Sequence, residues 1–202
     1  MSQSLILASS STSRRTMLAA AGVEFTTAMP DVDEDAVRAA YLLGSDAPFP
    51  GEAVANALAE RKALAISERH PEALVIGADQ VLVCEGRVFN KANDEAEARA
   101  TLTALRGRKH ELIAAAVIAK GDSVIWSSAD TAYLSMRDFS DEFLDEYLSR
   151  EIPDVLGSVG CYRIEGRGAQ LFSRVSGDQF SIRGLPLVAL LEALRQLGVL
   201  KR

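Results

Sequence analysis

The sequence has few of the residues that form disulfides or bind transition metals. Among its 202 residues only Cys84 and Cys161 are cysteines, and they lie too far apart to form a zinc-ligand pair or a redox motif. We therefore expect both thiols to be reduced and structural. The two histidines, His70 and His110, also lack the spacing of a metal-ligand pair.

Long apolar runs and an excess of positive charge are missing as well. No stretch is long enough to cross a bilayer, and the run at 5–8 is too short for a signal core and follows no basic leader. We therefore expect a cytoplasmic protein without a membrane partner. The formal net charge is −6 and the pI is near 5.1, so a broad basic surface for nucleic acid is not expected. Any phosphate must then meet a local cluster of cations.

What is present is the composition of one ordinary globular domain over 1–202, with 48% hydrophobic and 25% charged residues. Short apolar runs alternate with helical patterns, which predicts an α/β fold whose mixed sheet is partly parallel and partly antiparallel. Strands are predicted at 5–8, 23–28, 74–78 continuing at 81–84, and on both sides of the turn at Gly121-Asp122. Helices are predicted at 14–21, 35–43 and 52–68, after a capping box at Asp94 and Glu97, after Ser140, and from Pro186.

A serine-rich segment is the first candidate for chemistry. Residues 9–15 read Ser-Ser-Ser-Thr-Ser-Arg-Arg, between the first predicted strand and its helix. Free backbone N–H groups and the helix dipole favour an anion there, and the hydroxyl and guanidinium groups add donors. The alternative is a serine N-cap followed by solvated arginines.

Asp79 is the second candidate, because it interrupts an apolar run that reads as a buried strand. A buried carboxylate is costly unless it has a cation, a metal or a proton as partner. The alternative is an aspartate that only accepts hydrogen bonds from neighbouring backbone amides. Gly77 nearby permits another group to approach the backbone closely.

Lys62 shares an i, i+4 row with Val54, Leu58 and Ile66, so its side chain is predicted to point toward the buried side of its helix. A lysine in that position needs an anion, although a side chain that only snorkels along the apolar stripe fits the same pattern.

Lys91 and the acidic pair Asp33-Glu34 lie in predicted loops, where ordinary solvated residues are the alternative. The acidic pair has the oxygen ligands that a hard divalent cation prefers. Taken together, two arginines, two lysines and two or three carboxylates near strand and helix ends suit a magnesium-dependent attack on a phosphate.

Ordered motifs along nearly the whole chain resemble the Maf family. They are LILASSSTSRR, VDE, LAERKA, IGADQV, FNKAN, GRKHEL, and EGRGAQLF with GLPL. The resemblance implies two lobes around a central cleft, as in the inosine triphosphatases, and hydrolysis of a nucleoside triphosphate to the monophosphate and diphosphate. It also implies a divalent cation, Mg²⁺ or Mn²⁺, and a possible homodimer. Family members are linked to septum formation and to removal of non-standard nucleotides.

The resemblance assigns roles to particular residues. Asp79 matches the catalytic carboxylate that accepts a proton from the attacking water, and Glu34 and Asp79 are the implied metal ligands. The implied substrate-binding residues are Ser9, Ser11, Arg14, Arg15, Lys62, Gln80, Lys91 and Glu165.

The serine-rich motif, Asp79-Gln80 and Glu165-Gly166 look like the branch of the family that acts on 7-methyl-GTP. The carboxylate of Glu165 suits that base, because it accepts hydrogen bonds from a guanine edge and attracts the positive charge of the methylated ring. Thr12 in place of the usual proline, Ala114 in place of a threonine, and a longer 153–160 segment without the usual lysine depart from the family pattern. A dTTP- or UTP-preferring enzyme and a non-catalytic regulator of septum formation are the alternatives.

Overall fold

The structure, a computed structural model, describes residues 4–42 and 50–201. Its centre is a mixed sheet of seven strands in the order β2-β1-β3-β5-β6-β7, with β4 paired to β3. The strands are β1 Leu5–Ala8, β2 Thr26–Ala28, β3 Leu74–Cys84, β4 Arg87–Phe89, β5 Lys109–Lys120, β6 Ser123–Met136 and β7 Phe172–Ser176. β1 runs parallel to β2 and β3, and the remaining pairs are antiparallel. The predicted mixed α/β fold is therefore confirmed.

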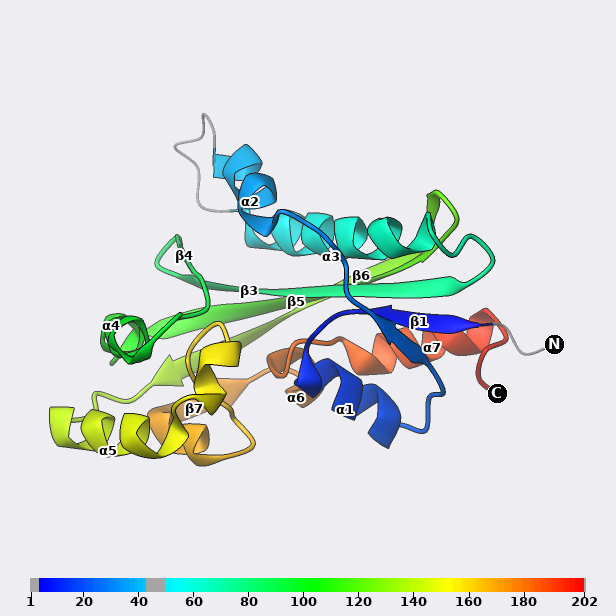
Figure 1. Ribbon diagram of the computed structural model, residues 1–202. Helices are drawn as coiled ribbons and strands as arrows, with labels where there is room; N and C mark the ends of the chain where they lie inside the picture. Colours follow the sequence, from blue (N-terminus) through cyan, green and yellow to red (C-terminus); the bar gives the residue numbers. More distant parts are fainter. Residues whose placement is uncertain (1–3, 43–49, 202) are drawn as a thin grey trace.

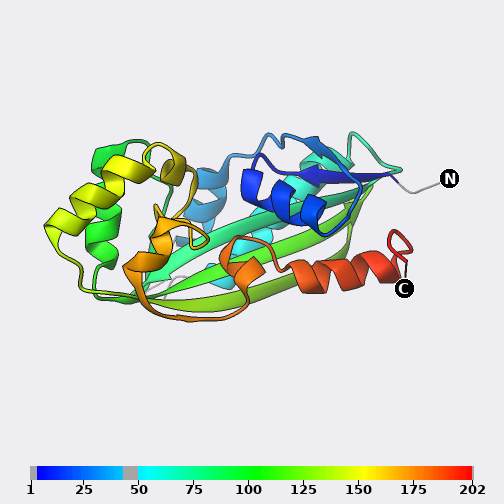
Figure 2. The same cartoon turned by 90° about the horizontal axis from the view of Figure 1, so that it is seen from below.

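The helices form groups around this sheet. They are α1 Thr12–Ala20, α2 Glu34–Leu42, α3 Gly51–Ser67, α4 Glu95–Leu105, α5 Asp141–Glu151, α6 Gln179–Ile182 and α7 Leu187–Gln196, with 3₁₀ turns η1 Asp154–Gly157 and η2 Arg167–Leu171. In Figure 1, α3 follows one face of the long strands, whereas α1 and α7 lie on the other side of the sheet. Figure 2 shows α4 and α5 at one end of the molecule and α1 and α7 at the other. The molecule thus has two lobes joined by β3, β5 and β6.

β3 passes from one lobe to the other and changes neighbours on the way. Along one edge it pairs with β1 up to Gly77, and then with β4 from Leu82 onward. Between these two pairings lies Asp79, which has a strand partner only on the β5 side, opposite Ala115. On the side of β1 and β4, the sheet therefore has a gap beside Asp79, between the two lobes.

Side chains of β3 alternate between the two faces of the sheet. Val75, Val81 and Val83 pack with the apolar side of α3, whereas Leu74 and Ile76 pack with α1 and α7. A third apolar cluster fills the lobe of α4 and α5. By this alternation Asp79 lies on the α3 face and its neighbour Gln80 on the opposite face.

Helix starts follow the predicted N-caps, but the capping box is half formed, because the Glu97 carboxylate accepts from the backbone N of Asn93 and not from that of Asp94. The Asp94 carboxylate accepts from the backbone N of Glu97 at 2.8 Å, and Ser140 accepts from that of Phe143 at 3.3 Å. The first helix begins at Thr12, two residues before the predicted start at 14, because the Ser11 hydroxyl accepts from the backbone N of Arg14. The strand predicted at 23–28 is limited to Thr26–Ala28, the residues that pair with β1.

Across 4–42 and 50–201, none of the helices combines the length and the apolar character that a bilayer crossing requires.

Candidate active site

A cleft of about 1300 Å³ opens between the lobes where the sheet lacks a strand beside Asp79. One wall is formed by the serine-rich segment 9–14 and the start of α2, and the other by the segment from Asp154 to Glu165. Residues far apart in the sequence therefore meet in one hollow.

Gly77 determines how closely α3 approaches β3. A Cβ atom built on Gly77 would lie 2.1 Å from the backbone O of Ala59 and 2.7 Å from the backbone N of Ala63, so only glycine fits this contact. The close contact carries Lys62, in the same turn of α3, to the Asp79 side of the sheet. The close approach predicted for Gly77 is confirmed.

Lys62 joins the two predicted carboxylates. Its Nζ atom lies 2.6 Å from Oδ1 of Asp79 and 2.6 Å from Oε1 of Glu34. Lys62 is only 8% exposed and Asp79 only 4%, as the helical row and the apolar strand predict. The cation that Asp79 requires is therefore Lys62, and the carboxylates that Lys62 requires are those of Asp79 and Glu34.

Glu34 also forms an ion pair with Arg38, which lies one helical turn further along α2. Arg38 donates to Glu34 at 2.9 Å. Desolvation raises the pKa of Glu34, but the hydrogen bond and charge of Lys62, together with Arg38, outweigh it and hold this pKa below its usual value. Asp33, the other member of the acidic pair, instead caps α2 by accepting from the backbone N of Ala36 at 2.9 Å.

The two carboxylate oxygens of Asp79 differ in their contacts within the described part of the chain. Its Oδ2 atom is buried and has no hydrogen-bond partner there, while Oδ1 is held by Lys62. A buried carboxylate oxygen without a partner is costly, so this atom is suited to accept a proton or to bind a cation.

Arg14 lies in the wall of the cleft, with its guanidinium fixed in place. Its Nε atom donates to the backbone O of Gly184 at 2.8 Å, and Nη1 donates to the Ser9 hydroxyl at 3.3 Å. Desolvation lowers the pKa of Arg14, and the charges of Asp79 and Glu34 oppose this effect. Ser9 and Ser11 line the same wall, and Ser11 also caps α1.

Lys91 lines the cleft on the side of β4, beyond the gap in the sheet. Desolvation lowers the pKa of Lys91, and the nearby positive charge of Arg14 adds to this effect. Repulsion between Lys91, Arg14 and Lys62 is relieved by anions, which supports a site for phosphate groups.

Gln80 and Glu165 also line the cleft, each with a partner. The Gln80 side chain donates to the backbone O atoms of Ser181 and Ile182 at 3.0 Å each, which holds α6 against the sheet. Glu165 forms an ion pair with Arg183, with 3.6 Å between Oε1 and Nε.

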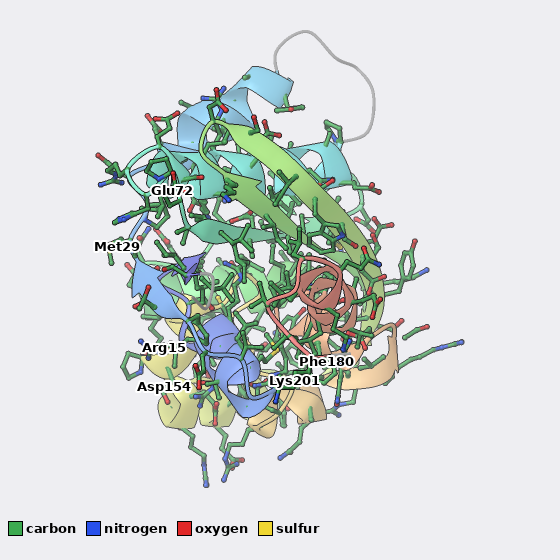
Figure 3. The ribbon with its side chains drawn as sticks, turned by 90° about the vertical axis from the view of Figure 1, so that its right-hand side faces the viewer. Arg15, Met29, Glu72, Asp154, Phe180 and Lys201 are labelled. Carbon is green, nitrogen blue, oxygen red and sulfur yellow. The ribbon has the colours of Figure 1, made fainter. Side chains whose placement is uncertain are left out.

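Arg15 is the predicted site residue that the structure does not bring to the cleft. It is exposed on α1 and is not part of the cleft lining. Figure 3 also labels Met29, which is 75% exposed and belongs to the cleft lining. All other predicted site residues line the cleft: Ser9, Ser11, Arg14, Glu34, Lys62, Asp79, Gln80, Lys91 and Glu165.

Three arginines of the cleft were not predicted: Arg38, Arg163 and Arg183. Arg38 follows Glu34 by four residues on one helix, a spacing that signals an ion pair and was available in the sequence. The backbone at Arg183 is held by hydrogen bonds from Ser13 and Gln80, which lie far away in the sequence, so no local pattern reveals this residue.

A metal centre built only from protein ligands is not found. Within the described ranges no three histidine, cysteine, aspartate or glutamate side chains form a group able to hold an ion. Glu34 and Asp79 provide two carboxylates on either side of Lys62, so a bound cation requires further oxygen atoms from a ligand or from water.

Comparison with known proteins gives the same family as the sequence motifs. The model of the Maf-like protein family matches residues 4–197. A nucleoside triphosphate pyrophosphatase of Granulibacter bethesdensis is 50% identical over 192 residues, which cover 95% of this chain and 96% of the relative. One of Caulobacter vibrioides is 47% identical over 194 residues, 96% of each chain. A 7-methyl-GTP pyrophosphatase of Brucella abortus is 42% identical over 196 residues, 97% of each chain. The chain therefore belongs to the family of Maf-like proteins.

Proposed function

We propose that this protein hydrolyses a nucleoside triphosphate between its α and β phosphates and releases the monophosphate and diphosphate. The observation that carries the proposal is the position of Lys62 Nζ, 2.6 Å from both Asp79 and Glu34, in a cleft that Arg14 and Lys91 also line. Carboxylates that activate water thus lie beside cations that bind phosphates. The names of the relatives from Granulibacter and Caulobacter support the same reaction.

Asp79 acts as the proton acceptor. A water molecule gives its proton to Oδ2 of Asp79, the carboxylate oxygen left without a partner, and its oxygen attacks the α-phosphorus. The bond between that phosphorus and the α,β-bridging oxygen breaks, and diphosphate leaves with this oxygen. Lys62 holds Oδ1 and so orients the carboxylate during proton transfer.

The cations stabilise the negative charge that develops on the phosphates. The guanidinium group of Arg14, held by Gly184 and Ser9, offers a fixed set of donors to phosphate oxygens. Lys91, which lines the cleft on the side of β4, adds a second positive charge for the leaving diphosphate. In phosphoryl transfer such positioning and charge stabilisation supply most of the catalysis.

A divalent cation, Mg²⁺ or Mn²⁺, fits this donor set. Magnesium binds to one or two carboxylates and completes its coordination with substrate phosphates and water. Glu34, which is held by Lys62 and Arg38, and Oδ1 of Asp79 would provide the carboxylate oxygen atoms, which leaves Oδ2 of Asp79 to accept the proton. When bound, the cation neutralises phosphate charge. Manganese binding in the presence of nucleotide, followed by electron paramagnetic resonance, is expected to weaken in Glu34→Gln.

The candidate substrate is 7-methyl-GTP. Glu165 in the cleft lining and the 7-methyl-GTP pyrophosphatase of Brucella abortus support it. The relatives with higher identity carry only the general name, so dTTP and UTP stay the alternatives. Diphosphate release from a panel of canonical and methylated triphosphates, with magnesium and with manganese, tests the choice. A clear preference for dTTP or UTP would refute it.

A regulator of septum formation that does not hydrolyse nucleotides is the rival function. The Asp79→Asn variant separates the two, because a regulator would keep its effect on septation without hydrolysis.

A cytoplasmic location and a homodimer remain predictions. Fractionation of cells and light scattering of the purified protein test them.

A further inference from the structure

The backbone of residues 181–184 is tied to the phosphate side of the cleft. Gln80 donates to the backbone O atoms of Ser181 and Ile182, Ser13 donates to that of Arg183 at 3.1 Å, and Arg14 donates to that of Gly184. The start of the Arg183 side chain is therefore fixed relative to the serine-rich wall.

The Arg183 side chain crosses from this fixed point to the opposite wall. Its Nε atom lies 3.6 Å from Oε1 of Glu165, beyond hydrogen-bond distance. Within the described residues Nε is buried and has no hydrogen-bond partner. A buried donor without a partner is costly, so an acceptor that enters the cleft gains by reaching it.

The ion pair between Arg183 and Glu165 also changes the electrostatic environment of a base that binds beside Glu165. A lone carboxylate attracts the cationic ring of 7-methylguanine more strongly than neutral guanine. Arg183 places a positive charge beside the same carboxylate, which reduces this advantage. A carboxylate such as that of Glu165 can accept hydrogen bonds from the N–H groups of a guanine edge, and a guanidinium group such as that of Arg183 can donate to an oxygen of that edge.

We propose that Arg183 is a specificity-determining residue, which with Glu165 reads the guanine edge and reduces discrimination in favour of the methylated, positively charged base. The inference rests on the proposed function, because it concerns the base side of the same cleft. It predicts opposite effects for the two members of the pair. Removal of the Arg183 charge raises the ratio of kcat/KM for 7-methyl-GTP to that for GTP, and removal of the Glu165 charge lowers it.

The experiment compares this ratio in the wild type, Arg183→Met, Arg183→Lys and Glu165→Gln. We expect a rise of about fivefold in Arg183→Met, a value near that of the wild type in Arg183→Lys, and a fall of similar size in Glu165→Gln. The double variant returns toward the wild-type ratio, since the two charges act in opposite directions. Arg195→Met, a surface change on α7, controls for loss of an arginine.

A ratio within twofold of the wild type in folded Arg183→Met, or a change in the same direction for both Arg183→Met and Glu165→Gln, would overturn the proposal. Dissociation constants of 7-methyl-GMP and GMP, measured by calorimetry, give the same ratio without hydrolysis. A protein that releases no diphosphate but shows the expected shift in binding would refute the proposed reaction and keep the role of Arg183. A protein that hydrolyses triphosphates but does not show the shift would support the proposed reaction and refute the role of Arg183.

Discussion

The Nζ atom of Lys62 lies 2.6 Å from Oδ1 of Asp79, across a helix–strand contact that the absence of a side chain at Gly77 makes possible. Both charged groups are buried, and Lys62 also contacts Glu34 at the same distance. Removal of the Lys62 charge would leave the buried Asp79 carboxylate uncompensated, which is strongly destabilising. The geometry of α3 on β3 thus controls both the stability of this region and the position of Asp79, the proposed proton acceptor.

Substitution of Gly77 by alanine tests this control. The new Cβ atom would meet backbone atoms of Ala59 and Ala63, which cannot rotate away, so α3 must move. We expect a loss of about 1–3 kcal/mol in the free energy of unfolding, measured with urea, and a loss of activity as Lys62 moves away from Asp79. Gly157→Ala is the control for stability, since a Cβ atom there meets nothing within 4 Å. Equal stability of both variants would argue against the tight contact.

The neighbouring arginines of α1 are expected to differ. Arg14 is held in the cleft wall by Gly184 and Ser9, whereas Arg15 is exposed and outside the lining. Loss of a donor that stabilises transition-state charge costs about 10² to 10³ in kcat. Steady-state kinetics are expected to show a loss of this size in Arg14→Met and a change of less than about tenfold in Arg15→Met. Comparable losses in both variants would mean that Arg15 reaches the substrate.

Stability is expected to fall as the pH decreases from 6.5 toward 4, because of His110. Burial lowers the pKa of His110 to about 4, and its Nε2 atom lies 2.7 Å from the Tyr162 hydroxyl. The unfolded chain, with the usual pKa of 6.5, binds a proton in this range and the folded protein does not, so protonation favours unfolding. The contribution, present above pH 6.5, amounts to about 3 kcal/mol.

Urea unfolding at several pH values measures this dependence. His110→Gln is expected to flatten the slope between pH 6.5 and 4, whereas His70→Gln, at an exposed position, keeps it. An unchanged slope in His110→Gln would show that other groups cause the loss of stability.

The sequence predicts the parts of the site that depend on local periodicity. The apolar run around Asp79 identifies a buried strand, and the i, i+4 row of Lys62 identifies the side of the helix that faces it. A buried Asp79 and a buried Lys62 each require an opposite charge, and in the structure the two side chains pair with one another. The cap at Ser140 and the turn at Gly121-Asp122 follow equally local rules.

Other parts depend on packing between distant segments and have no local signal. Arg183 gains its position from hydrogen bonds of α6 to Gln80 and Ser13, which lie more than 100 residues away. Asp33 caps α2, whereas Glu34 contacts Lys62. Which residue has which role depends on where α2 starts, and a pair of adjacent acidic residues does not reveal that position. Arg14 and Arg15 likewise face different directions because they are successive residues of α1, and the packing of α1 on the sheet determines which of them lines the cleft.

The most direct test of the account is diphosphate release by Asp79→Asn, with nucleotide binding measured on the same protein. Asparagine keeps the shape of the side chain but cannot accept the proton of the attacking water. We predict binding within about threefold of the wild type and a fall in kcat of about 10² to 10⁴, with Asp122→Asn, in the exposed β5–β6 turn, as the control. An Asp79→Asn variant that binds nucleotide and keeps a tenth or more of the wild-type rate would contradict the account.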